Sequence, residues 1–189
     1  MINKIYLSEK TISKVREELR KKTFVLLDDF FDENFYFLLK SEILRKKFSK
    51  KKIPDQYSFS KAENCRKFEK IFLSPQFLEF LEETFDLKIK KIEFSMRKFQ
   101  RGDYTLLHDS EKSNDGKEFI FFISDFWDAG FGGNVFYLGK KPLIVQPRGN
   151  RLFVIRRNKS RRFVKYLNSR CDKKSFVLVQ GRINAPARI

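Results

Sequence analysis

From Leu87 onward, the apolar residues of this chain recur at every second position, in short segments that continue almost to the C-terminus. A period of two is the pattern of a strand that buries one face. Glycine, proline, asparagine or aspartate separates the segments and indicates turns between them. The pattern predicts about eight strands, at residues 89–99, 104–108, 117–124, 134–138, 143–146, 151–156, 163–167 and 175–181.

The first half of the chain has mostly helical spacing, with one short apolar run at residues 23–27 that predicts a buried strand. Ser8 and Asp32 are candidate N-caps, because their side-chain oxygens can accept hydrogen bonds from the first turn of a helix. Ser74 followed by Pro75 predicts the start of a further helix, since proline is favoured at the first helical position.

Two segments before the strands have no clear period. The lysine-rich residues 46–52 are interpreted as a solvated helix end, and residues 53–66 as a loop. Helices followed by a series of short strands indicate a single α+β domain, 1–189, built on a β-sandwich or jelly roll. Its helical part is expected at about 1–87 and its β-rich core at about 88–183.

The composition is that of a folded protein. Hydrophobic residues make up 41% of the 189 residues and include 23 phenylalanines, so the chain can bury a substantial core. The longest apolar runs are far shorter than the roughly 20 residues that span a bilayer, and the N-terminus lacks the pattern of a signal peptide. Cys65 and Cys171 are far apart and form no CxxC pair, which disfavours zinc. We therefore expect a cytoplasmic protein with no membrane partner.

The charge is strongly unbalanced, with 41 Lys+Arg against 24 Asp+Glu and a formal net charge of +17. One interpretation is an anionic partner such as RNA or the ribosome. The other is compositional drift in an AT-rich coding sequence, because lysine, phenylalanine, isoleucine and asparagine are all abundant. The sequence leaves these two interpretations equal.

A longer ordered pattern lies between residues 97 and 181. It consists of Gly102-Asp103-Tyr104, His108, an apolar strand, Trp127, Gly132-Gly133, Pro147-x-Gly149 and a last strand that contains Gly181. This order resembles the iron(II)/2-oxoglutarate oxygenases of the prolyl 4-hydroxylase type, particularly the ribosomal-protein prolyl hydroxylases. The resemblance covers most of the chain. It implies a double-stranded β-helix, or jelly roll, with supporting N-terminal helices.

Proteins of this family hold iron with two histidines and one carboxylate. By the resemblance, His108 matches the first histidine, and it is the only histidine of the chain. The position of the family's aspartate is Ser110. Asp109 and Glu111 are neighbouring carboxylates, but adjacent residues of a strand point to opposite faces, so Asp109 needs a bulge or turn to reach the metal. His108 and Asp109 are candidate relic metal ligands. For His108 the alternatives are a general base or a hydrogen-bonded strand residue, and for Asp109, Ser110 and Glu111 the alternative is an ordinary acidic turn.

The resemblance places two further family positions on residues of a different kind. Val164 stands where the second histidine is expected, and Phe176 stands where an arginine would bind the far carboxylate of 2-oxoglutarate. Lys174 and Arg182 share the strand face of Phe176 by parity and are candidate carboxylate-binding residues. Fe(II) and 2-oxoglutarate are thus cofactors by resemblance only, and the alternative is that the chain uses neither.

The densest basic cluster of the sequence lies beside Val164. A basic hairpin tip can bind phosphates through charge and counterion release, and a solvated tip is the equal alternative. The candidate anion-binding residues are Arg156, Arg157, Lys159, Arg161 and Arg162.

Three functions follow as hypotheses. The first is a divergent oxygenase of prolyl hydroxylase type with an impaired or lost iron site, acting on a protein of the translation machinery. The second is a catalytically inactive pseudo-oxygenase that binds RNA, the ribosome or another acidic partner. The third is an enzyme that uses the old pocket for other chemistry, which no motif supports. The sequence does not determine the oligomeric state.

Overall fold

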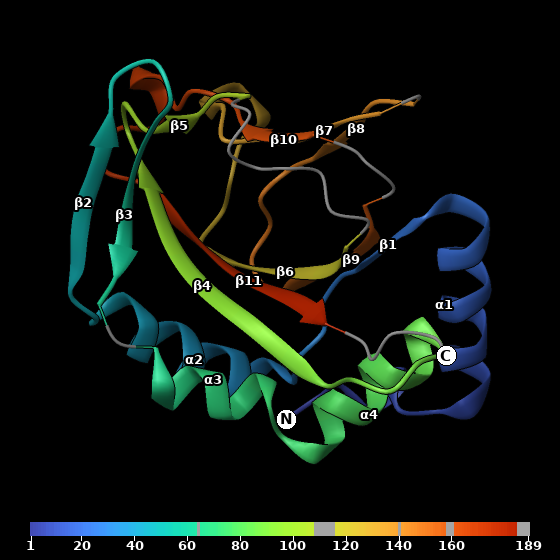
Figure 1. Ribbon diagram of the computed structural model, residues 1–189. Helices are drawn as coiled ribbons and strands as arrows, with labels where there is room; N and C mark the ends of the chain where they lie inside the picture. The colour runs from blue at the N-terminus through green and yellow to red at the C-terminus, as the bar shows by residue number, and fades with distance from the viewer. Residues whose placement is uncertain (64, 108–115, 140, 158–160, 185–189) are drawn as a thin grey trace.

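The protein is a curled antiparallel sheet with helices packed against one side of it (Figure 1). The computed structural model describes residues 1–63, 65–107, 116–139, 141–157 and 161–184. None of the helices within these ranges is long and apolar enough to cross a bilayer.

The helices begin where the sequence predicts them to begin. The Ser8 side chain accepts a hydrogen bond from the first turn of α1, Asp32 does so for α2, and Ser74 caps α4, which has Pro75 in its first turn. The α-helices are α1 (Glu9–Lys22), α2 (Glu33–Leu44), α3 (Arg66–Phe72) and α4 (Pro75–Phe85), and the short 3-10 helices are η1 (Lys4–Tyr6), η2 (Ala129–Phe131) and η3 (Ser169–Cys171).

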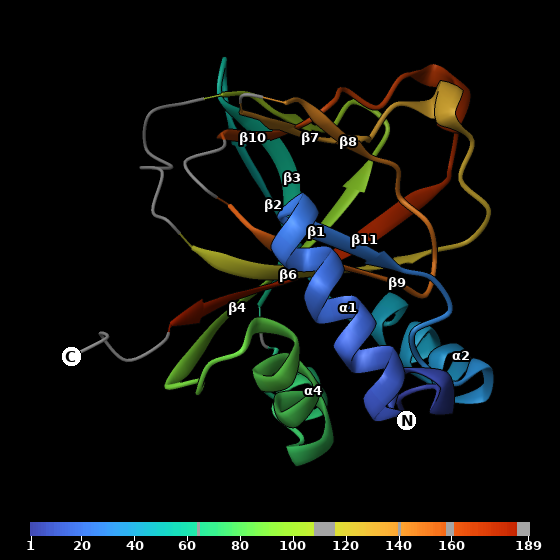
Figure 2. The same cartoon turned by 90° about the vertical axis from the view of Figure 1, so that its right-hand side faces the viewer.

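The sheet runs in the order β1-β9-β6-β11-β4-β3-β5-β10-β7-β8, and β2 pairs with β3. The first five strands of this order form the layer that packs on the helices. The last five curl over the face of that layer that points away from the helices (Figure 2). The expected jelly roll is therefore confirmed. The strands are β1 (Phe24–Leu27), β2 (Phe48–Ile53), β3 (Tyr57–Ala62), β4 (Lys91–Gln100), β5 (Tyr104–Thr105), β6 (Lys117–Ser124), β7 (Val135–Leu138), β8 (Leu143–Val145), β9 (Arg151–Arg156), β10 (Arg161–Val164) and β11 (Ser175–Asn184).

The interpretation of residues 46–66 as a helix end and a loop is wrong. Strands β2 and β3 form a hairpin there, and α3 starts at the end of the segment. The lysines of β2 hide its strand character, because four of its six residues are exposed and no apolar period remains. Lysine on an outer strand protects the sheet from pairing with other chains.

The two faces of the sheet belong to two separate cores, as β6 illustrates. Phe119, Phe121 and Ile123 pack with residues of the helices. Ile120 and Phe122 point the other way, into the interior of the curl. Both faces of β6 are buried, which explains why residues 119–123 form a continuous apolar run in the sequence. The second core, inside the curl, contains Val164 and Phe176, two of the positions singled out by the resemblance.

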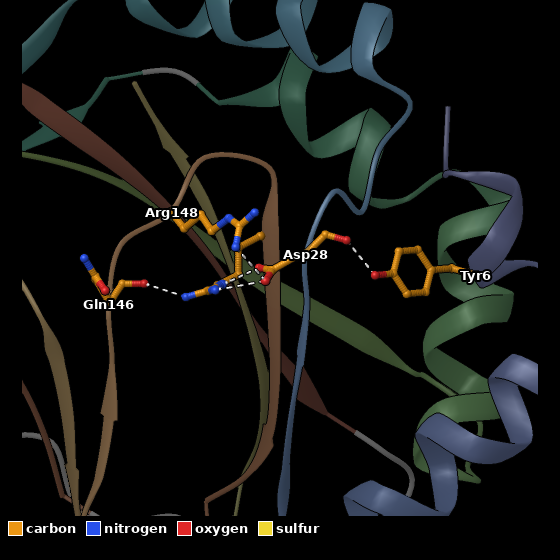
Figure 3. Close-up of polar contacts among 5 residues, drawn as sticks. Tyr6, Asp28, Gln146 and Arg148 are labelled. Carbon is orange, nitrogen blue, oxygen red and sulfur yellow. Dashed lines mark hydrogen bonds and ion pairs between the residues drawn. The ribbon is translucent and has the colours of Figure 1, made fainter. Parts of the chain in front are cut away.

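Asp28 ties the end of β1 to the start of β9 (Figure 3). Arg151 donates two hydrogen bonds to its carboxylate, over 2.5 and 3.0 Å, and Arg148 donates a third over 3.1 Å. Arg151 also donates to the Gln146 carbonyl, while the Tyr6 hydroxyl donates to the Asp28 carbonyl over 2.5 Å. The hydrogen bond from Arg151 is the main cause that lowers the pKa of Asp28 below its ordinary value of 3.8, and the charges of both arginines add to it.

We expect Arg151→Gln to lower the free energy of unfolding by about 1 kcal/mol near neutral pH. Because the folded pKa of Asp28 is depressed, the stability that its carboxylate contributes is present above pH 3.8. This stability is lost as the pH falls through the lower pKa of the folded state. Urea unfolding at several pH values should thus show the loss shrinking in acid. Arg148→Gln is the control and should cost less, because that side chain makes one contact and is 55% exposed. A loss that is the same at every pH would contradict the expectation.

Candidate functional site

A cavity of about 260 Å³ opens into the curl of the sheet. Its walls come from five strands that are distant in sequence, because the curl brings β3, β5 and β10 opposite β4 and β11. The described residues that line it include three arginines and no acidic side chain. The lining residues are Tyr57, Phe59, Arg97, Phe99, Thr105, Leu106, Arg162, Val164, Leu178 and Arg182.

Val164, at the expected position of the second histidine, is a buried wall of this cavity. It pairs with Thr105 of β5 and Val135 of β7 across the sheet. Its backbone N–H donates to the Thr105 hydroxyl over 2.7 Å. The side chain is aliphatic and offers no atom to a metal.

Phe176, at the expected position of the arginine, is fully buried among aromatic rings. It stacks on Phe99 with ring centroids 5.2 Å apart and meets Trp127 edge to face at 5.0 Å. Gly133 has a φ of +74°, and a Cβ placed on it would lie 2.8 Å from the Phe176 ring. Glycine is therefore required for the backbone to approach the ring so closely. A buried phenyl ring offers no group that can bind a carboxylate.

The two candidate carboxylate-binding residues do not lie together. Arg182 lines the cavity. Lys174 precedes the other end of β11, and its ammonium lies over the rings of Phe126 and Phe131 at 5.4 and 5.0 Å. Eight residues of extended chain separate the two positions by roughly 27 Å. Only Arg182 can contribute to the cavity.

A buried polar cluster joins β6 to β7, β10 and β11, and we call its five members the Glu118 cluster. The Glu118 carboxylate accepts hydrogen bonds from the Tyr137 hydroxyl at 2.7 Å and from the Gln180 amide at 2.8 Å. Arg162 and Arg157 place Nη1 atoms 3.4 and 3.8 Å from its oxygens. Burial, and then the charge of Glu118, raises the pKa of Tyr137 well above its ordinary value, so its hydroxyl stays protonated. Buried charges are stable only when they are paired in this way.

The residues of the basic cluster predicted from the sequence lie in different environments. Arg157 and Arg162 are buried in the Glu118 cluster, and Arg161 is exposed on β10. Arg156 points to the helical side, where it donates to the Phe85 carbonyl over 2.8 Å. Lys159 lies outside the described residues. The anion-binding role of these residues as one group stays a prediction.

Asp103, of the Gly-Asp-Tyr motif, has a structural role. Its buried carboxylate accepts from the Ser58 hydroxyl at 2.7 Å and the Gln100 N–H at 3.0 Å, and it pairs with Lys50. These contacts hold the turn before β5 against the β2–β3 hairpin.

Of the three positions at which the resemblance places metal ligands, the structure describes only Val164, whose side chain cannot bind iron. Within residues 1–63, 65–107, 116–139, 141–157 and 161–184, no three His, Cys, Asp or Glu side chains are grouped to hold a metal ion. His108, Asp109 and Ser110 lie outside these ranges, so the roles proposed for them stay predictions. At the two family positions that are described, the side chains are valine and phenylalanine.

Sequence comparison relates part of the chain to a curated protein. No family model matches the chain. Prolyl 3-hydroxylase OGFOD1 of Mus musculus is 33% identical over 86 residues, which are 42% of this chain and 16% of that protein. The chain thus matches a small part of the curated relative.

Solved structures share the fold over nearly the whole chain. A prolyl-4-hydroxylase of Pseudomonas putida has a TM-score of 0.71 at 13% identity, with 92% of this chain and 98% of that chain covered. A 2OG-Fe(II) oxygenase family oxidoreductase of Burkholderia pseudomallei has 0.69 at 11% identity, with 93% and 91% covered. A prolyl hydroxylase of Trichoplax adhaerens, solved with a hypoxia inducible factor peptide, has 0.69 at 13%, with 93% and 90% covered. The resemblance read from the sequence is therefore confirmed: this chain has the fold of the iron(II)/2-oxoglutarate oxygenases, in the form found in prolyl hydroxylases.

Proposed function

We propose that this chain is a prolyl hydroxylase-type fold that has lost its iron site and acts in the cytoplasm as a binding module. The observation that carries the proposal is the burial of Phe176 between Phe99 and Trp127, at the position where the resemblance expects the arginine for 2-oxoglutarate. Val164, at the position of the second histidine, supports it further. The resemblance thus places one change at a metal ligand and another at the residue that binds the co-substrate. A single tolerated substitution does not account for both changes.

The proposal is tested by anaerobic calorimetry with Fe(II) and 2-oxoglutarate. We expect the wild-type chain to show no iron-dependent 2-oxoglutarate binding in the micromolar range, and His108→Ala to behave alike. A matched variant, Ser110→Asp/Val164→His, restores the residue types of the two other family ligands and should bind Fe(II) more tightly than the wild type. Micromolar binding by the wild type that disappears in His108→Ala would instead establish the divergent oxygenase, with a protein of the translation machinery as its expected substrate.

An acidic partner such as RNA or the ribosome is the proposed ligand of the module. The net charge of +17 supports it, and so do the exposed Lys51 and Lys52 of β2. Lysines on the surface attract phosphates without reading sequence, through release of counterions. RNA binding should accordingly weaken steeply with salt. A salt-independent affinity, or none at low salt, would exclude this partner class.

A further inference from the structure

Three arginines from three strands converge on the cavity inside the curl. Arg97 of β4 lies over the Phe59 ring, with its guanidinium carbon 4.9 Å from the ring centroid. Arg162 of β10 is buried, with 5% of its side chain exposed, and Arg182 of β11 is exposed. These side chains approach one volume from different sides, since β10 lies opposite β4 and β11. Such a cavity suits a ligand that accepts hydrogen bonds in several directions.

Arg162 is held in place by its partners in the Glu118 cluster. Its Nη2 donates to the Gln180 amide oxygen over 2.9 Å, and its Nη1 lies 3.4 Å from Glu118. A guanidinium fixed in this way loses little entropy when it binds a ligand. The arrangement is that of a positioned arginine at the wall of a cavity.

The charge around the cavity is positive. Among the described residues, the lining includes Arg97, Arg162 and Arg182 and no acidic side chain. The Glu118 carboxylate beside Arg162 is also paired with Arg157. Apolar walls such as Phe59, Val164 and Leu178 strengthen this attraction by lowering the local dielectric constant.

We propose that this cavity binds a phosphate monoester group. A phosphate monoester carries close to two negative charges on three oxygens at neutral pH, which suits three lining arginines that approach from several directions. A planar carboxylate, in contrast, is satisfied by the fork of one arginine. The site uses other positions than Phe176, and it needs no metal. The inference rests on the binding-module proposal and names the chemical group that the module recognises.

Calorimetry in the presence of EDTA tests the site with AMP, inorganic phosphate and succinate as probes. We expect AMP to bind, inorganic phosphate to bind as the bare group, and succinate to bind much more weakly. Arg97→Gln and Arg182→Gln should each weaken AMP binding about tenfold, the effect of losing one charge-assisted hydrogen bond. Arg20→Gln is the control, because Arg20 lies on α1, has 54% of its side chain exposed and does not line the cavity.

Several outcomes would overturn the proposal. Succinate that binds as tightly as AMP would exclude the phosphate assignment, and equal AMP affinity in all four proteins would exclude the site. A short RNA with and without a 5′-phosphate separates this inference from the binding-module proposal. Equal binding of both RNAs without AMP binding would leave the module and remove the cavity as its site. Preference for the 5′-phosphate, lost in Arg182→Gln, would support both.

Discussion

Replacing Phe176 with alanine should lower the free energy of unfolding by about 3–5 kcal/mol, the usual cost of removing a buried phenylalanine ring. The ring is fully buried, stacks on Phe99 and meets Trp127 edge to face, so its removal leaves a cavity lined by rigid rings. Aromatic neighbours cannot collapse into such a space without leaving their rotamers. Urea unfolding measures the loss, and the fluorescence of Trp127, the only tryptophan of the chain, reports directly on the site.

Phe126→Ala is the matched control for this variant. Phe126 is the same residue type, but it is 73% exposed, and its ring contact is with Lys174. Its removal should change the stability by no more than about 0.5 kcal/mol. If Phe176→Ala were as stable as this control, the ring would not be a packed part of the core. The position would then resemble an open ligand pocket, and the proposal of a lost co-substrate site would be weakened.

The elements predicted well are those whose signal is local. Ser8, Asp32 and Ser74 all cap helices as expected, because an N-cap needs only its own side chain and the next turn of backbone. The strands from β4 onward follow from their period of two. The hairpin β2–β3 could not be found in this way, because β2 is an outer strand rich in lysine, whose stability comes from pairing with β3.

The same distinction between local and non-local signals applies to the candidate site. The order of motifs located Val164 and Phe176, and the structure places both inside the curl, in one core. Phe176 lies on β11, and the rings around it come from β4, β6 and the loop after β6, so no local pattern predicts these contacts. The Glu118 cluster was missed, although a signal existed. Glu118 has the same parity as the inward-facing Ile120 and Phe122, and a charge on that face of a buried strand requires a partner.

Replacing Glu118 with glutamine should destabilise the protein by about 3 kcal/mol or more, because it removes the carboxylate from two buried arginines. Arg157 and Arg162 are 6% and 8% exposed, so water cannot replace the lost charge. Glutamine keeps the size of the side chain, and the Tyr137 hydroxyl still has an oxygen to which it can donate. The loss therefore measures the charge and not the shape. The stability is measured by urea unfolding in low and high salt. Added salt should restore little of the lost stability, since screening is weak for buried pairs.

Glu93→Gln on β4 is the control, because Glu93 is 51% exposed, lies on a strand beside β11 and pairs with Lys91 at 3.4 Å. Exposed pairs of this kind contribute no more than about 1 kcal/mol. Glu118→Gln should also weaken AMP binding, since Arg162 would lose one of the partners that position it, whereas Glu93→Gln should not. If Glu118→Gln retained both the wild-type stability and the wild-type affinity, the two arginines would be held by other contacts, and the positioned arginine of the cavity would have to be abandoned.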